Sequence, residues 1–89
     1  MRQESEFFED QVLDLLVMAR RLPEALRIEE LLTDSGVEYC IETGPYVGGL
    51  LFRRELTGVF FYVRQEVLES SQQLLLKHRF KPYDRRTGR

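Results

Sequence analysis

Apolar residues fill most of the segment from residue 11 to residue 20, and they form no clean helical stripe. On an extended chain, Leu15 and Val17 would share one face, and Leu16 would lie on the other. Apolar residues on both faces are typical of a strand that is buried on both sides. We therefore predict a strand here, with a helix from Phe7 to Arg21 as the competing interpretation.

The next segment has the signals of a helix start, an apolar stripe and a helix end. Pro23 has the fixed backbone angle that suits a first turn, and Glu24 places a negative charge near the positive end of the helix dipole. Gly36 can take the left-handed conformation that ends many helices, and Val37 supplies the apolar contact that often follows. The stripe consists of Leu22, Ala25, Ile28, Leu31 and Leu32.

Two further strands are predicted, one on each side of a glycine-rich segment. Residues Val37–Glu42 alternate between apolar and polar side chains, and Val59–Val63 forms an apolar and aromatic run after Gly58. Between them, Thr43–Thr57 contains three glycines and a proline, so we expect a long connection there. A short strand at Leu50–Phe52 could lie within it.

A second helix is predicted from Glu66 to about Arg79, followed by a possible short edge strand at Phe80–Tyr83. Pro82 lacks an N–H group, so it suits an edge strand but not a central one. The inner stripe of this helix consists of Val67, Leu68, Ser71, Leu74, Leu75 and His78.

The predicted order is β-α-β-β-α, with one possible strand at the end. Helices that alternate with strands in this way pack together on one face of an antiparallel sheet. The predicted fold class is therefore α+β, with the ferredoxin-like plan βαββα(β). In this interpretation residues 1–10 form a flexible N-terminal arm, residues 11–83 form a single α+β domain, and residues 84–89 form a basic C-terminal tail.

The face of the sheet opposite the helices is predicted to be apolar. Its residues would be Val12, Leu16, Met18, Cys40, Phe60 and Tyr62. An exposed apolar patch of this kind usually marks an interface. We therefore expect a homo-oligomer, most simply a dimer, whose sheet faces meet, with Phe7 and Phe8 of the arm contributing. The alternatives are that the arm and the long connection cover this face within one chain, or that a ligand does.

The composition limits the classes of protein to which this chain can belong. It has 89 residues, of which 43% are hydrophobic and 31% are charged, and its formal net charge is −2. These values are typical of one small globular domain and not of a disordered chain. No apolar run approaches the roughly 20 residues that cross a bilayer, and the acidic N-terminal region lacks the basic start of a secretory signal. We therefore expect a cytoplasmic protein that does not contact a membrane.

The chain has one cysteine and one histidine, which limits its chemistry further. A single cysteine excludes an internal disulfide, and the two residues cannot complete a four-ligand zinc site. Cys40 is predicted in mid-strand and His78 near a helix end, so they do not make a thiolate–imidazole pair. The Gly44–Gly49 segment lacks the lysine and hydroxyl residue of a phosphate loop. The sequence therefore predicts no enzyme, no cofactor and no metal site.

The run RLPEALRIEELLTDSGVEYCIE, the loop Val47–Gly49 and the strand Phe61–Val63 carry a family resemblance. Together with Leu74 and Leu75, they resemble the prokaryotic signal-transducing domains of unknown function. The resemblance covers about residues 12–81. It implies a ferredoxin-like fold, a distant similarity to PII nitrogen-signalling proteins and no catalytic residues. It does not imply nucleotide or 2-oxoglutarate binding, because the nucleotide-binding residues of PII proteins have no match here.

PII proteins contact their partners through a long loop between the second and third strands, so the resemblance implies a protein-contacting loop at Thr43–Thr57. Glycines would give this loop freedom, aromatic residues would supply contact area, and an arginine pair would supply directional donors. The predicted partner-binding residues are Pro45, Tyr46, Gly48, Gly49, Leu50, Phe52, Arg53 and Arg54. The function that we expect is a regulatory or protein-interaction module, with an unidentified protein as the partner.

Two other functions are weighed against this one. The basic C-terminal segment, with Phe80 and Tyr83 among its arginines and lysines, could bind single-stranded nucleic acid weakly. The net negative charge, and a first strand without an outward aromatic residue, argue against nucleic acid as the main partner. A small-molecule sensor, with its ligand in an apolar cleft between subunits, is the other alternative.

Overall fold

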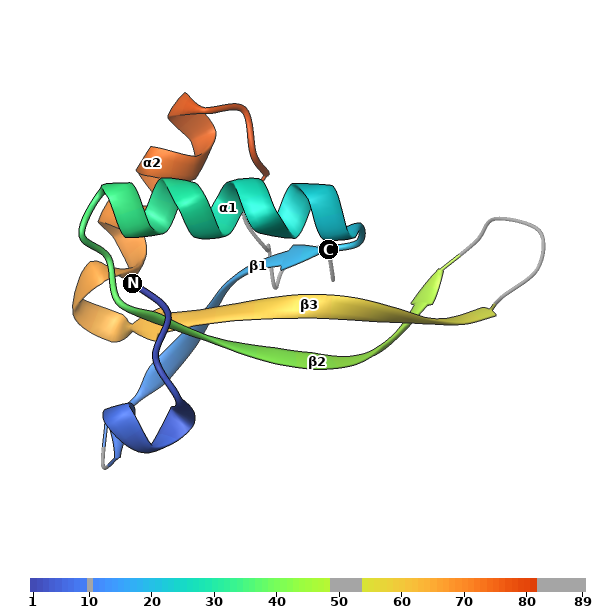
Figure 1. The fold of residues 1–89 in the computed structure, drawn as a ribbon, viewed down its shortest axis with the longest axis horizontal. Coiled ribbons are helices and arrows are strands. Elements are labelled where there is room, and N and C mark those ends of the chain that lie inside the picture. Colours follow the sequence, from blue (N-terminus) through green and yellow to red (C-terminus); the bar gives the residue numbers. More distant parts are fainter. Residues whose placement is uncertain (10, 49–53, 82–89) are drawn as a thin grey trace.

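The computed structural model describes residues 1–9, 11–48 and 54–81, and the side chains of these residues except those at positions 46–48, 54 and 55. Within these residues the fold is α+β, with two α-helices and a three-stranded antiparallel sheet in the order β1-β3-β2. Both helices lie on one face of the sheet (Figure 1). The elements are a 3-10 turn η1 at Ser5–Phe8, β1 at Leu13–Ala19, α1 at Leu22–Asp34, β2 at Tyr39–Gly48, β3 at Arg54–Arg64, a 3-10 turn η2 at Gln65–Val67, and α2 at Leu68–Lys77.

The predicted strand in the first third of the chain is confirmed, but β1 contains a bulge that changes which side chains face the helices. Leu15 pairs with Tyr62 and Val17 pairs with Phe61, so Leu16 is an extra residue without its own partner on β3. Leu16 is fully buried in the core beneath the helices. Its predicted place on the opposite face is therefore corrected, and Leu15 shares a face with Tyr62 instead of with Val17.

The core lies between the helices and the sheet, and it uses most of the predicted helical stripes. Three residues of α1 and one apolar residue of α2 are fully or almost fully buried against the strands. Leu22, predicted in the first stripe, is instead 67% exposed because it lies at the start of the helix. The buried cluster consists of Leu16, Val17, Ala19, Ala25, Ile28, Leu32, Tyr39, Phe61, Val63 and Leu75.

The predicted end of α1 is confirmed. Gly36 has a φ of 74°, which a residue with a side chain rarely adopts. The N–H group of Val37 donates to the carbonyl of Leu32 at 2.9 Å, which is the long bond of a Schellman motif. The left-handed glycine therefore turns the chain from α1 directly into the approach to β2.

The second helix begins later than predicted and ends in the same motif as α1. The 3-10 turn η2 precedes α2, so the regular helix starts at Leu68 and not at Glu66. At its end, the N–H group of Phe80 donates to the carbonyl of Leu75 at 2.8 Å. Arg79 takes the left-handed position with a φ of 67°, a role usually filled by glycine. The possible edge strand at Phe80–Tyr83 lies mostly outside the described residues.

The prediction of a long connection at Thr43–Thr57 is wrong over most of this range. β2 continues to Gly48 and β3 begins at Arg54, and the two strands stay paired along this stretch. β2 is an edge strand, where a proline such as Pro45 can be accommodated without breaking the ladder. The glycines and the proline therefore do not end the strand as their turn preferences suggested. The short strand predicted at Leu50–Phe52 lies outside the described residues.

The N-terminal segment, predicted to be a flexible arm, is docked in the structure. Arg2 forms a parallel bridge with Tyr39, the first residue of β2. The N–H group of Gln3 donates to the Tyr39 carbonyl at 2.7 Å, and the Tyr39 N–H group donates to the Met1 carbonyl at 3.1 Å. Phe8 is only 3% exposed. The start of the chain therefore adds to the outer edge of the sheet before it crosses to η1.

Candidate functional site

The predicted partner-binding residues fall on a two-stranded ribbon at the far end of the sheet. Pro45 is exposed and pairs with Thr57, and the backbones of Gly48 and Arg54 pair where the described ribbon ends. Tyr46 belongs to the same ladder, where its backbone pairs with that of Leu56. The structure therefore brings Pro45, Tyr46, Gly48 and Arg54 together on β2 and β3. The other four, Gly49, Leu50, Phe52 and Arg53, lie outside the described residues.

The ribbon extends beyond the third strand of the sheet. β1 pairs with β3 only from Val59 to Arg64, whereas β2 pairs with β3 as far as Arg54. Residues Arg54–Gly58 and their partners on β2 are therefore not flanked by β1. Figure 1 shows this ribbon reaching well past the helices. Among the described residues of this ribbon, Pro45 and Thr57 are exposed, Leu56 is half-buried and Gly58 is buried.

Four of the six residues predicted for the opposite sheet face lie on that face, one lies in the core and one lies before the strand. Met18, Phe60 and Tyr62 are half-buried, and Cys40 is 7% exposed. Leu16 belongs to the core, as described above, and Val12 lies before β1 with 66% of its surface exposed. The apolar area left open on this face is therefore smaller than the alternation of residues in the sequence suggested.

The Cys40 thiol is shielded from solvent on this face. Burial raises the pKa of the Cys40 thiol, and the negative charge of Glu42 raises it further. A thiol with a raised pKa carries little thiolate near neutral pH, and the thiolate is the reactive form. Cys40 therefore acts as a small apolar side chain here.

The arm covers part of the same face. The turn η1 lies on the side of the sheet away from α1 and α2 (Figure 1). Its two aromatic rings, Phe7 and Phe8, lie 5.1 Å apart between their centroids. Only Phe8 is buried, and Phe7 is 42% exposed. This observation favours the alternative in which the arm shields the sheet within one chain.

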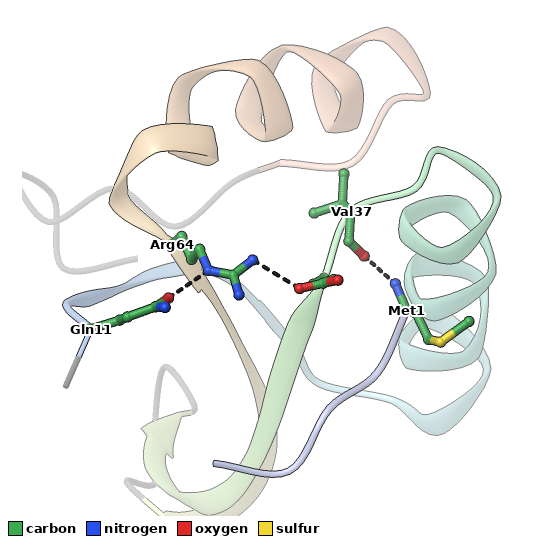
Figure 2. Close-up of polar contacts among 5 residues, drawn as sticks. Met1, Gln11, Val37 and Arg64 are labelled. Carbon is green, nitrogen blue, oxygen red and sulfur yellow. Dashed lines mark hydrogen bonds and ion pairs between the residues drawn. The ribbon is translucent and has the colours of Figure 1, made fainter. Parts of the chain in front are cut away.

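Arg64, the last residue of β3, fastens the arm to the sheet. Its guanidinium carbon lies 5.2 Å from the centre of the Phe7 ring and 5.0 Å from that of the Phe8 ring. Its Nη1 atom donates to Glu38 Oε2 at 2.8 Å, and its Nε atom donates to Gln11 Oε1 (Figure 2). One side chain therefore joins η1, the start of β1 and the approach to β2.

Alternation along β3 places Arg64 on the same face as Phe60 and Tyr62, and this signal was available in the sequence. Its partners in the arm were not predictable, because no periodicity relates residues 7 and 8 to β3.

At the start of the chain, the Met1 amino group donates to the Val37 carbonyl (Figure 2). Burial lowers the pKa of this amino group, although the charge of Glu38 opposes the change.

A second polar network joins the arm, α1 and β2. The Tyr39 hydroxyl donates to Glu29 Oε1 at 3.0 Å and lies 3.5 Å from Thr33 Oγ1. Arg2 Nη1 lies 3.9 Å from the same Glu29 oxygen. Burial raises the pKa of the Tyr39 phenol, and Glu29 raises it further. This network stabilises the junction of three elements: the arm, α1 and β2.

An open groove of about 300 Å³ lies between the second half of α1 and the residues that follow α2. The Arg27 guanidinium carbon lies 5.9 Å from the centre of the Phe80 ring, so this ring already has a partner. Phe80 also packs against the core, which limits its use as a stacking surface for a base. The groove is lined by Arg27, Glu30, Leu31, Asp34, His78 and Phe80.

Within the described residues, no three side chains of histidine, cysteine, aspartate or glutamate are grouped to hold a metal ion. No helix in that part of the chain is long and apolar enough to cross a membrane. The chain was also compared with protein-family models, with curated proteins and with solved structures, and none of the three comparisons found a match.

Proposed function

We propose that this chain is a non-catalytic, regulatory protein-interaction module that meets a partner protein through the ribbon formed by β2 and β3. We also propose that its fold is ferredoxin-like. The strand order β1-β3-β2 and the position of both helices on one face support this assignment. The signal-transducing role that the family resemblance implies belongs to the same proposal.

The observation that carries the proposal is the length of the ribbon beyond β1. Five residues at the start of β3, Arg54–Gly58, pair only with β2 among the described residues. A two-stranded hairpin gains little stability by itself in water. A paired extension that reaches past the core is therefore better explained by contact with a partner than by a contribution to folding.

The proposal does not require a second copy of the chain. Met18 and Phe60 are half-buried and Phe8 and Cys40 are buried, so part of the apolar surface that a dimer through the sheet face would use is already covered within one chain. The described residues also offer no observation that favours nucleic acid. The cluster of arginines in the C-terminal tail lies outside them, and Phe80 is already engaged.

The experiment is site-specific photocrosslinking in a lysate of the native cell. A photoreactive residue replaces Thr57, which is exposed on the ribbon, and in a matched control it replaces Gln73, which is exposed on α2. We expect one protein to be captured through position 57 and not through position 73. Equal capture at both positions, or none at position 57, would contradict the proposal.

A further inference from the structure

The outer edge of β2 has a defined pattern of backbone groups. Both backbone groups of Tyr39 bond to the arm, so they point away from β3. In an antiparallel ladder the backbone groups of successive residues point to alternate sides. Those of Ile41 and Thr43 therefore also point outward, whereas those of Cys40 and Glu42 point to β3. Pro45 fits this pattern, because its missing N–H group then falls on the outer side.

The arm covers only the first residue of this edge. After Gln3 the chain turns into η1 on the face of the sheet away from the helices. In the described part of the chain, no backbone group bonds to the outward groups of Ile41 and Thr43. Within the described residues, this leaves a window of two unpaired outward residues, Ile41 and Thr43, with the docked arm at one end and Pro45 at the other. The bridge between Arg2 and Tyr39 shows that this edge accepts a strand.

A second copy of the chain fits this window poorly. Two β2 strands related by a two-fold axis must pair outward residues with outward residues. If Ile41 faces its own copy, Thr43 faces Tyr39, whose backbone groups the arm already holds. If Thr43 faces its own copy, Ile41 faces Pro45, which cannot donate.

The remaining register within the window pairs Ile41 with Thr43. It places the two copies of Glu42 directly opposite each other on neighbouring strands, and like charges in that position are destabilising. The Glu42 side chain is exposed, so it is available to a partner strand. Each symmetric register therefore carries a cost that a strand of different sequence avoids.

We propose that the outer edge of β2 at Ile41–Thr43 binds an extended segment of a partner protein that carries a lysine or arginine opposite Glu42. The main-chain bonds would come from the two outward residues, and the selectivity would come from the Glu42 carboxylate. This is strand addition to a sheet edge, with a charged side chain as the selective contact. The inference rests on the proposed function, because it names the chemistry of the segment that the module binds.

The test measures amide hydrogen exchange by NMR on the full chain, with synthetic peptides as probes. One peptide alternates valine and threonine around a central lysine, and the other has glutamate in place of the lysine. We expect the lysine peptide to slow exchange at Ile41 and Thr43 by about tenfold or more. The amides of Cys40 and Glu42, already bonded to β3, should change much less. The glutamate peptide should have no effect.

Three variants separate the contributions. Thr43→Pro removes one outward N–H group and should abolish peptide binding, whereas Thr43→Ala keeps that group and should bind normally. Glu42→Lys should reverse the preference between the two peptides, and it keeps the test informative if Thr43→Pro does not fold. Equal binding of both peptides, or equal binding by the two Thr43 variants, would overturn the inference.

Two further results would also overturn it. Slow exchange at Ile41 and Thr43 in the free, dilute protein would show that the chain itself covers this edge. Slowing of amide exchange that increases with protein concentration, together with a doubled mass in light scattering, would assign the edge to a second copy.

The two proposals can fail separately. If a partner captured through position 57 leaves these amides unchanged, the edge inference fails and the ribbon proposal stands. If the lysine peptide binds but position 57 captures nothing, the ribbon proposal fails and the edge inference stands.

Discussion

The phenolic O–H group of Tyr39, a residue that is only 1% exposed, donates a hydrogen bond to Glu29 Oε1 across 3.0 Å. The same tyrosine pairs with Val63 on β3 and holds the arm through its backbone. Its ring lies 5.7 Å from that of Phe61 in the core. Tyr39 is therefore the residue at which the arm, the sheet and α1 meet.

Removing this hydroxyl should destabilise the fold without displacing the ring. We expect Tyr39→Phe to lower the free energy of unfolding by about 1 kcal/mol, the usual net contribution of a hydrogen bond. Glu29→Gln keeps an acceptor for the hydroxyl but removes the charge that faces Arg2, so it should cost less. Urea denaturation at neutral pH measures both changes. An unchanged midpoint for Tyr39→Phe would show that the bond contributes nothing.

The Tyr39 phenol should also make stability depend on alkaline pH. Its pKa is raised in the folded chain above the ordinary value of 10.0, chiefly by burial. A raised pKa means that the folded state favours the neutral phenol, so its contribution is complete below pH 10.0 and is lost as the pH rises through the folded-state pKa. The stability difference between the wild type and Tyr39→Phe should therefore shrink above pH 10. Denaturation midpoints of both proteins from pH 7 to 11 provide the comparison, and a constant difference would contradict this assignment.

Arg64 should control whether the arm stays docked. Arg64→Ala removes the contacts with both phenylalanine rings, the bond to Gln11 and the ion pair with Glu38. Because this side chain is partly buried, we expect a loss of about 1–3 kcal/mol in stability and faster proteolysis near Phe8. Arg64→Lys keeps a charge for Glu38 but not the planar guanidinium, so its effect should be intermediate. Limited chymotrypsin digestion with mass spectrometry tests this, and equal cleavage in all three proteins would exclude the arm-fastening role.

Ser71 offers a stabilising substitution. Its side chain is 1% exposed in α2, and its hydroxyl has no hydrogen-bond partner among the described residues. Burying an unpaired hydroxyl is costly, and alanine is the better helix former, so Ser71→Ala should raise stability by about 1 kcal/mol. Ser70→Ala is the matched control, because the exposed Ser70 hydroxyl donates to the Val67 carbonyl at 3.1 Å. Thermal melts should show a higher midpoint for Ser71→Ala than for either the control or the wild type.

The two helix ends should respond in opposite directions to a change in side chain. Gly36 and Arg79 have nearly the same left-handed φ, 74° and 67°. A Cβ atom at Gly36 would meet nothing within 4 Å, so Gly36→Ala should cost about 1 kcal/mol from the backbone conformation alone. Arg79→Gly should relieve the corresponding strain and leave stability unchanged or higher. A loss of stability in Arg79→Gly would show that the arginine side chain itself stabilises the end of α2.

The sequence alone determined the elements whose signals are local. The proline and glycine at the ends of α1 fixed its limits because each acts through its own backbone angles. The near-continuous apolar run of β1 and the aromatic run of β3 identified both strands, because such runs are typical of strands that are buried on both faces. Alternation also placed Arg64 correctly beside Tyr62, since neighbouring side chains on a strand point to opposite faces.

The features that depend on pairing between distant segments could be seen only in the folded chain. The bulge at Leu16 shifts the register of β1 against β3, although the sequence is locally regular. The residues before the bulge therefore change face, whereas Val17 and Ala19 after it keep the core face. The glycines and Pro45 stay in the ladder because β3 pairs with them and because β2 lies at an edge. The arm docks at Tyr39 and Arg64 through contacts that span 36 or more residues along the chain. Such contacts form only once the sheet exists, because no local propensity specifies them.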